Sequence, residues 1–226
     1  TLTSTVNDVA YPAFSKLQDE LDRLRAYFFT IARANLSLIG LVLVVIAVYV
    51  ENLLVLGEYQ KYFGAIPLVH IFAAVGLFRS VSALVPQLLN AVGEARLNFY
   101  YSLANALLMP TAFLIGAQVS LAGVAWAWVV AFPGAVMLLF YFGAQALEMP
   151  LHTVLGRIVP AGLVLVPALG VALGAQWLAE ASLPQMPLLA LTLGVLSTLG
   201  VGLGVIAWHE REAIAVIRGR YSVQNA

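Results

Sequence analysis

The clearest candidate for chemistry in this chain is an arginine inside a long apolar stretch. Arg79 lies near the middle of residues 65–92, a run long enough to cross a bilayer as a helix. An unpaired guanidinium is costly at that depth, so Arg79 should face other protein or a water-filled cavity. A guanidinium stays charged at any relevant pH and can hold two oxygens at once, which suits phosphate. We therefore expect Arg79 to bind an anionic or polar group within the membrane.

Polar residues recur at helical spacing after this arginine and again in the next apolar run. Ser82, Pro86 and Asn90 follow Arg79 at steps of three, four and four, which places all of them on one face of a helix. A similar stripe begins at Asn98 in the next run. Two facing stripes, one of them cationic, would line a hydrophilic cavity between helices. The candidate substrate-binding, cavity-lining residues are Arg79, Ser82, Asn90, Asn98, Ser102 and Asn105.

A structural role for the same residues stays open. Arg79 could fasten helices by pairing with helix carbonyls or with an acid such as Glu51, although Glu51 falls near the outer end of its own span. Asn and Ser side chains also hold helices together in membranes. His70 fits a helix-packing residue better than a proton carrier, and we assign it no role.

Three prolines fall well inside successive apolar runs. Pro86, Pro110 and Pro133 each remove a backbone hydrogen bond and bend a helix. They are candidate hinges in a bundle that opens on alternate sides. Static shaping for packing is the alternative interpretation.

The composition predicts an all-α, polytopic transmembrane helix bundle. The chain is 62% hydrophobic and 10% charged, whereas soluble domains average about 25% charged residues. Six apolar segments have the length needed to span a bilayer, namely residues 36–56, 65–92, 98–118, 121–146, 158–179 and 187–208. Short joints between them predict antiparallel neighbours.

The basic residues predict the orientation of these spans. When the joints are assigned alternately to two sides, one side receives Lys16, Arg23, Arg25, Arg33, Arg96, Arg157, Arg211, Arg218 and Arg220. The other side receives only Lys61. Cytoplasmic loops carry the excess of basic residues, so both ends of the chain are expected to be cytoplasmic.

The sequence also predicts how the chain is divided. Residues 1–13 would end a truncated preceding span, and residues 14–35 would form a cytoplasmic amphipathic connector helix with a capping box from Ser15 to Gln18 and an Asp19–Arg23 ion pair. Residues 36–146 would form four spans of one lobe. Residues 147–208 would form an accessory two-span hairpin, tightly paired through the GxxxG spacings Gly170/Gly174 and Gly200/Gly204. Residues 209–226 would be a cytoplasmic tail.

Other functional classes find no support in the sequence. The chain has no cysteine, and its three histidines lie far apart, so neither a metal nor another cofactor is expected. A net charge of zero gives no reason to expect a nucleic-acid partner. No paired carboxylates, nucleophile–base pair or phosphate-binding Gly loop is found, and an enzyme is not expected.

Three short stretches resemble a known family. Residues 11–19 (YPAFSKLQD), followed by Arg23, Arg25 and Tyr27, resemble the "fPafSrLQdd…rlrr.y" stretch of polysaccharide flippases of the O-antigen and colanic-acid type, within the multidrug/oligosaccharidyl-lipid/polysaccharide exporter superfamily. Residues 54–59 (LVLGEY) are similar to its "llLGekW" turn, and residues 89–96 (LNAVGEAR) to its "l.A.Gr" joint. Tyr59 stands where that family usually has Trp, and Glu94 stands where a basic residue often follows the Gly.

The resemblance implies a transporter of twelve to fourteen helices in two lobes, of which this chain would be the C-terminal half. Such proteins move undecaprenyl-pyrophosphate-linked oligosaccharides across the bacterial cytoplasmic membrane by alternating access. The expected partners are therefore the lipid bilayer, the lipid-linked oligosaccharide and the missing N-terminal half. No motif of the family marks Arg79, so its role depends on its position alone.

Three other functions stay open at this point. A drug/cation antiporter of the same superfamily would need a membrane-embedded carboxylate in the missing half. A membrane-embedded glycan polymerase or ligase would need large outer loops, and the longest outer joint here is residues 57–64. A purely structural membrane subunit would tolerate every substitution on the cavity face.

Overall fold

The computed structural model describes residues 11–182 and 186–209, and within these ranges the protein is built of helices without a strand. A short helix covers residues 11–16. The elements that follow are α2 (Leu21–Leu56), the short 3-10 helix η1 (Gln60–Ala65), α3 (Ile66–Ser82), α4 (Val85–Ala91), α5 (Ala95–Ala117), α6 (Leu121–Ala146), α7 (Leu151–Leu163), α8 (Leu165–Ser182) and α9 (Pro187–His209). The predicted all-α class is confirmed.

Six helical stretches among the described residues are long and apolar enough to cross a membrane: Leu21–Leu56, Gln60–Ala91, Ala95–Ala117, Gly123–Ala146, Leu151–Leu178 and Pro187–Trp208. They overlap the six predicted segments one for one. The protein is therefore a multi-pass helical bundle, as its composition indicates.

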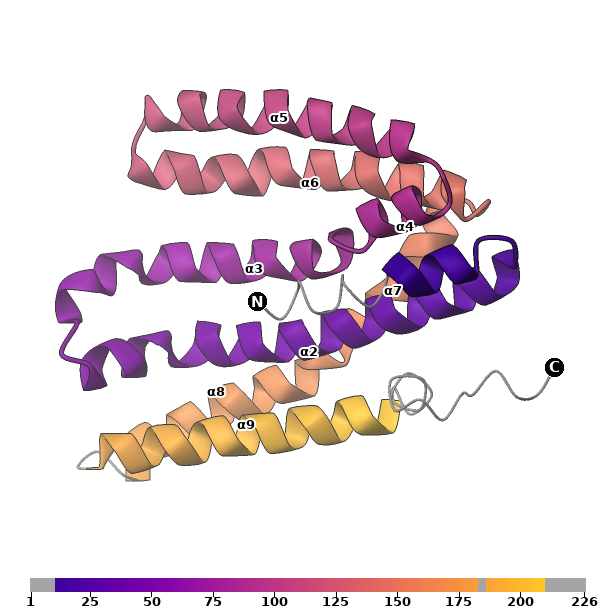
Figure 1. Ribbon diagram of the computed structural model, residues 1–226. Coiled ribbons are helices and arrows are strands. Elements are labelled where there is room, and N and C mark those ends of the chain that lie inside the picture. Colours follow the sequence, from indigo (N-terminus) through magenta and orange to yellow (C-terminus); the bar gives the residue numbers. More distant parts are fainter. Residues whose placement is uncertain (1–10, 183–185, 210–226) are drawn as a thin grey trace.

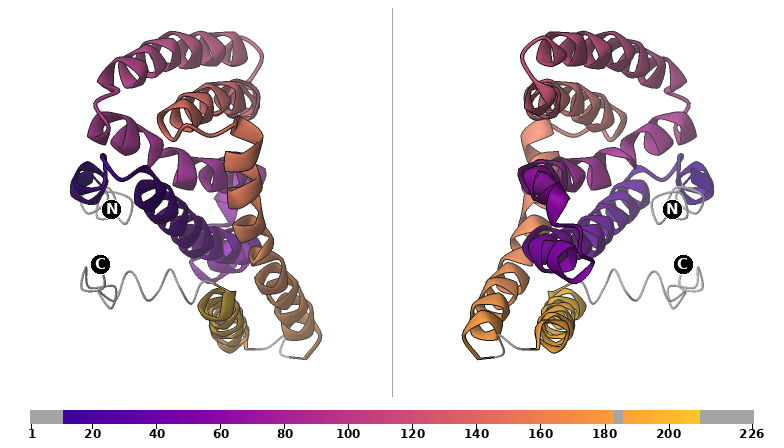
Figure 2. Two further views of the ribbon diagram at one scale, coloured as in Figure 1. Left: turned by 90° about the vertical axis from the view of Figure 1, so that its right-hand side faces the viewer. Right: turned by 90° about the vertical axis from the view of Figure 1, so that its left-hand side faces the viewer.

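The long helices form three antiparallel pairs (Figures 1 and 2). Helix α2 packs along α3, α5 along α6, and α8 along α9. The α2–α3 pair lies in the middle, with the α5–α6 pair on one side and the α8–α9 pair on the other (Figure 1). The α2–α3 and α5–α6 connections lie at one end of the bundle, and the α4–α5 and α6–α7 connections lie at the other (Figure 1). This alternation is the arrangement that the short joints predict.

Two of the six spans are interrupted, and a proline explains each interruption. Helix α3 ends at Ser82, four residues before Pro86, and α7 ends at Leu163, four residues before Pro167. A proline cannot donate to the carbonyl four residues earlier, and its ring clashes with that carbonyl. Each helix therefore ends at the residue whose carbonyl the proline would have met.

Pro110 and Pro133 act differently from Pro86. Both lie inside helices that continue past them, α5 and α6. The structure thus has one break, at Pro86, and two helices that continue through their prolines, and the hinge roles of the three prolines stay predictions. The second break, at Pro167, was not predicted from the sequence.

The connector expected over residues 14–35 is not a separate helix. The chain leaves the helical conformation between residues 17 and 20, and α2 then runs without interruption from Leu21 into the first span. The predicted capping box is wrong, because Ser15 lies inside the helix of residues 11–16 and Glu20 precedes α2 without a side-chain cap. Arg23 pairs with Glu20 at 2.8 Å instead of Asp19. The apolar stripe is confirmed where Leu24 and Phe28 enter the core.

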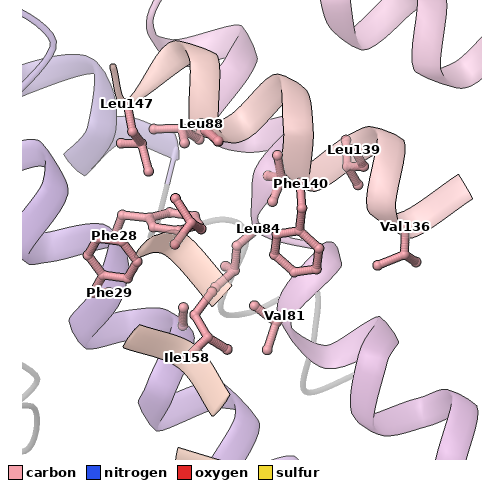
Figure 3. Packing of buried hydrophobic residues seen from close by; sticks show 14 of the residues in the cluster. Phe28, Phe29, Val81, Leu84, Leu88, Val136, Leu139, Phe140, Leu147 and Ile158 are labelled. Carbon is pink, nitrogen blue, oxygen red and sulfur yellow. The ribbon is translucent and has the colours of Figure 1, made fainter. Parts of the chain in front are cut away.

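The main core lies where α2, α4, α6 and α7 meet (Figure 3). Phe28 of α2, Leu84 and Leu88 of the broken span, and Leu147 after α6 are almost completely buried there. Helix α7 contributes Ile158 to this core, whereas Val164, Leu165 and residues of α8 form a second cluster with α2 and α9. The fifth span is therefore shared between two clusters that divide near its break, and the predicted domain boundary at residue 147 stays a prediction.

Close helix packing occurs at other glycines than the sequence predicts. A Cβ added to any of the four GxxxG glycines, at positions 170, 174, 200 and 204, would meet no atom within 4 Å, so the predicted tight pairing through them is wrong. Gly116 of α5 and Gly123 of α6 touch instead, since a Cβ at Gly123 would lie 2.3 Å from the Gly116 carbonyl oxygen. Gly194 and Gly202 of α9 make room for Tyr49 and Leu41 of α2.

Candidate functional site

The break in the second span sets the surroundings of Arg79. Arg79 lies in the last turn of α3, three residues before its end at Ser82. Unpaired carbonyls make the C-terminal end of a helix partially negative, which favours a cation there. The local structure thus offsets part of the cost of a guanidinium within a span, and the Arg79 side chain remains exposed at this position.

Arg79 lines a cavity of about 200 Å³ between the broken span, α5 and α6. The broken span contributes Arg79, Ser82, Ala83 and Pro86. The other wall consists of residues of α5 and α6, namely Tyr101, Asn105, Met109, Trp128, Phe132 and Leu139. We call this space the Arg79 cavity. Its lining is mostly apolar with a few convergent polar groups, the usual character of a small-molecule site.

Two polar groups in the Arg79 cavity lack a protein partner. Among the described residues the ion pairs are Arg23–Glu20 and Arg25–Asp22, so Arg79 has no acidic partner there. Glu51, which the sequence left open as a partner, lines a separate small cavity with Asn52 and Gln176. The Asn105 side-chain oxygen is buried and accepts no hydrogen bond. Arg79 is thus an unpaired cation on the cavity wall, and Asn105 of the same wall has a buried side-chain oxygen without a hydrogen-bond partner.

The cavity also carries two aromatic side chains suited to a ring-shaped or partly apolar ligand. Tyr101 of α5 and Trp128 of α6 line it, and Trp128 is held by Phe113 and Phe132 at ring-centroid distances of 5.6 and 5.2 Å. Aromatic faces bind apolar ring surfaces, and their polar tips can hydrogen-bond. A cation, an amide and aromatic faces together fit a ligand with an anionic group beside a polar ring.

The structure brings together some of the predicted site residues and separates others. Arg79, Ser82 and Asn105 share the Arg79 cavity, together with the hinge candidate Pro86. Asn98 donates to Asn90 at 3.0 Å, a contact outside the cavity that ties α5 to α4. Ser102 is exposed on α5 and does not line the cavity. The cavity-binding roles of these residues stay predictions.

Sequence reasoning missed Tyr101 and Trp128. Tyr101 lies three residues after Asn98 and four before Asn105, so it shares their face of the helix and could have been predicted from this spacing. Trp128 comes from α6, whose sequence has no polar stripe, and only the tertiary packing places it opposite Arg79. His70 is exposed, and its Nε2 lies 2.9 Å from the Ala47 carbonyl oxygen of α2.

A separate feature of the described residues is the distribution of the side chains that bind metal ions. No group of three or more His, Cys, Asp or Glu side chains comes together in residues 11–182 and 186–209. The polar side chains that line the Arg79 cavity are a guanidinium, an amide, two hydroxyl groups and an indole.

Comparison with known proteins found a partial relative. No protein-family model matches the chain, and no solved structure matches it. A stretch of 123 residues, 53% of this chain, is 29% identical to the lipopolysaccharide biosynthesis protein WzxC of Escherichia coli (strain K12). The match covers 24% of the length of that protein, so the chain is similar to one part of it.

Proposed function

We propose that this chain is part of a polysaccharide flippase that moves undecaprenyl-pyrophosphate-linked oligosaccharide across the bacterial cytoplasmic membrane. It acts by alternating access and serves polysaccharide biosynthesis. The similarity to WzxC, a lipopolysaccharide biosynthesis protein, supports this class of function. The six candidate spans support a transporter rather than a soluble enzyme.

The observation that carries the proposal is the unpaired Arg79 beside Asn105 in a cavity within the bundle. A lipid-linked oligosaccharide is anionic at its pyrophosphate and polar along its sugars. The guanidinium of Arg79 binds the pyrophosphate, because its planar donors match phosphate oxygens. The Asn105 oxygen accepts from a sugar hydroxyl, and Tyr101 and Trp128 contact a sugar ring.

The remaining length of the transporter completes the pathway. The relative is about four times as long as the matched part, since that part covers 24% of it. We propose that a second lobe faces the open side of the Arg79 cavity, and that relative motion of the two lobes exposes the cavity to each side in turn. In this arrangement both ends of the present chain lie in the cytoplasm, on the side with the excess of basic residues.

Replacing Arg79 by Ala in the intact protein tests this function. The assay measures surface polysaccharide in a strain that depends on the protein, at protein levels matched by immunoblot. Charged hydrogen bonds contribute about 1.5–3 kcal/mol each, so export should fall by about tenfold or more. Arg79→Lys keeps the charge but loses the two-point contact, and should retain part of the export.

Arg96→Ala is the matched control. Arg96 lies at the start of α5 and donates to the Tyr100 hydroxyl at 3.0 Å, outside the Arg79 cavity. Its removal takes away one positive charge and leaves the cavity unchanged, so export should continue. Unchanged export by Arg79→Ala, at normal protein levels, would remove Arg79 from the mechanism.

A further inference from the structure

The broken end of α3 leaves the Ser80 carbonyl without its usual donor. In a continuous helix the N–H of Leu84 would bond to the Ser80 carbonyl, four residues earlier. Here the Leu84 N–H bonds to the Val81 carbonyl at 3.1 Å, and the Ala83 N–H bonds to the Arg79 carbonyl at 3.1 Å. The Ser80 carbonyl has therefore lost its helical partner, one residue from Arg79.

A buried asparagine of another helix takes that place. The Asn35 side-chain amide of α2 donates to the Ser80 carbonyl oxygen. Both residues are buried, with 5% of Asn35 and 3% of Ser80 exposed. A carbonyl buried from water must find its partner within the protein. Because a carbonyl can only accept, Asn35 must present its NH₂ group here.

We infer that Asn35 is the positioning residue of the Arg79 cavity. By holding the Ser80 carbonyl, it fixes the last turn of α3 against α2 and thereby sets the direction in which Arg79 and Ala83 face. The break created by Pro86 makes this contact necessary. The importance of Arg79 for transport rests on the proposed function, but the positioning contact itself does not.

Cysteine labelling measures the positioning without measuring transport. The chain contains no cysteine, so Ala83→Cys gives it one thiol on the cavity wall, next to the end of α3. The rate of reaction with a water-soluble maleimide is measured in membranes of the intact protein, with any cysteine outside this chain replaced by serine. Ala117→Cys, on an exposed position of α5, gives a reference rate far from the break.

Asn35→Leu removes the donor and keeps a side chain of similar size. The freed turn should open more often, and labelling at position 83 should rise about fivefold, the equivalent of roughly 1 kcal/mol. Labelling at position 117 should stay the same. Ser37→Ala is the matched control, because Ser37 is fully buried on the same helix but its hydroxyl has no hydrogen-bond partner.

A second substitution separates positioning from packing. Pro86→Ala restores an N–H at position 86 and lets the helix continue, so that the Leu84 N–H can bond to Ser80. In a Pro86→Ala background, Asn35→Leu should therefore leave the labelling rate at position 83 unchanged. If Asn35→Leu alone does not fold, the double variant should recover folded protein, for the same reason.

The outcomes divide clearly. The inference is overturned if Asn35→Leu labels like Ser37→Ala, if labelling falls, or if the effect or folding defect persists in the Pro86→Ala background. If the labelling results hold while Arg79→Ala still exports polysaccharide, the positioning role stands and only the proposed function fails.

Discussion

Tyr49 and Thr198 are 149 residues apart in the sequence, and their hydroxyl oxygens lie 3.0 Å apart in the interior. Thr198 donates to the Gly194 carbonyl at 2.8 Å, so the single Tyr49 hydroxyl proton is shared between the Thr198 oxygen and the Ala172 carbonyl oxygen, which lies 3.3 Å away. One buried phenol thus joins α2 to both α8 and α9. Gly194 permits this contact, because a Cβ there would lie 2.8 Å from the Tyr49 hydroxyl oxygen.

Tyr49→Phe should weaken the attachment of the α8–α9 pair to α2 without disturbing the packing of the aromatic ring at position 49. The substitution removes a buried hydrogen-bonding hydroxyl, worth about 0.5–1.5 kcal/mol. The thermal unfolding midpoint of the detergent-solubilised protein should fall by about 2–4 °C. Tyr62→Phe, at an exposed position, should leave the midpoint unchanged. Equal midpoints for the two variants would show that the buried hydroxyl does not hold the pair.

Gly123→Ala should disrupt the α5–α6 pair. An added methyl would overlap the Gly116 carbonyl, which is backbone and cannot rotate away. Forcing a methyl into a packed contact costs about 1–3 kcal/mol. Gly134→Ala is the control on the same helix, because a Cβ there meets nothing within 4 Å. Thermal unfolding should show a lower midpoint for Gly123→Ala only, and a similar loss for both variants would show that the contact with Gly116 is not the cause.

The spans could be predicted from the sequence because a bilayer imposes a length and an apolar composition on each of them. The break in the second span could not be placed as readily. Pro86 was expected to bend its helix, but the helix ends at Ser82, because a proline acts on the carbonyl four residues earlier. The GxxxG spacings failed for a different reason. Spacing identifies a helix face with small residues, but it does not say which neighbour that face meets.

The candidate site was predictable where its residues share one helix. The helical spacing around Arg79 predicts Ser82 on the same face, and the spacing on α5 predicts Asn105. Both residues line the Arg79 cavity. Residues whose partners come from distant helices were missed. Asn35 is the last residue of the predicted connector, just before the first apolar run, and nothing in the sequence reveals that it meets a carbonyl left free by a break 45 residues later.

Arg25 should hold the start of α2 against the end of α6. Its Nε donates to the Leu147 carbonyl at 2.8 Å, and one of its terminal nitrogens donates to the Glu148 carbonyl at 3.2 Å. Glu148 has a φ of 49°, a conformation that a non-glycine residue adopts only with support. Arg25→Lys cannot form both contacts, so amide hydrogen exchange at the α6–α7 joint should accelerate about fivefold.

Arg23→Lys is the control for Arg25→Lys. Arg23 is about half exposed and pairs with Glu20 within its own segment, so exchange at the joint should not change. If exchange at the joint stays slow in Arg25→Lys, other contacts determine the conformation of Glu148.

Asn105→Leu should separate stability from transport. The Asn105 side-chain oxygen is buried without a partner, which disfavours the folded protein when no ligand is bound. Leucine has a similar size and no unsatisfied group, so the thermal unfolding midpoint should stay the same or rise by a few degrees. Polysaccharide export should fall several-fold, because the acceptor for a sugar hydroxyl is lost. Met109→Leu, also on the α5 wall of the Arg79 cavity, should leave both measurements unchanged. A lower midpoint with unchanged export would mean that Asn105 supports the packing of α5 and does not contact the transported molecule.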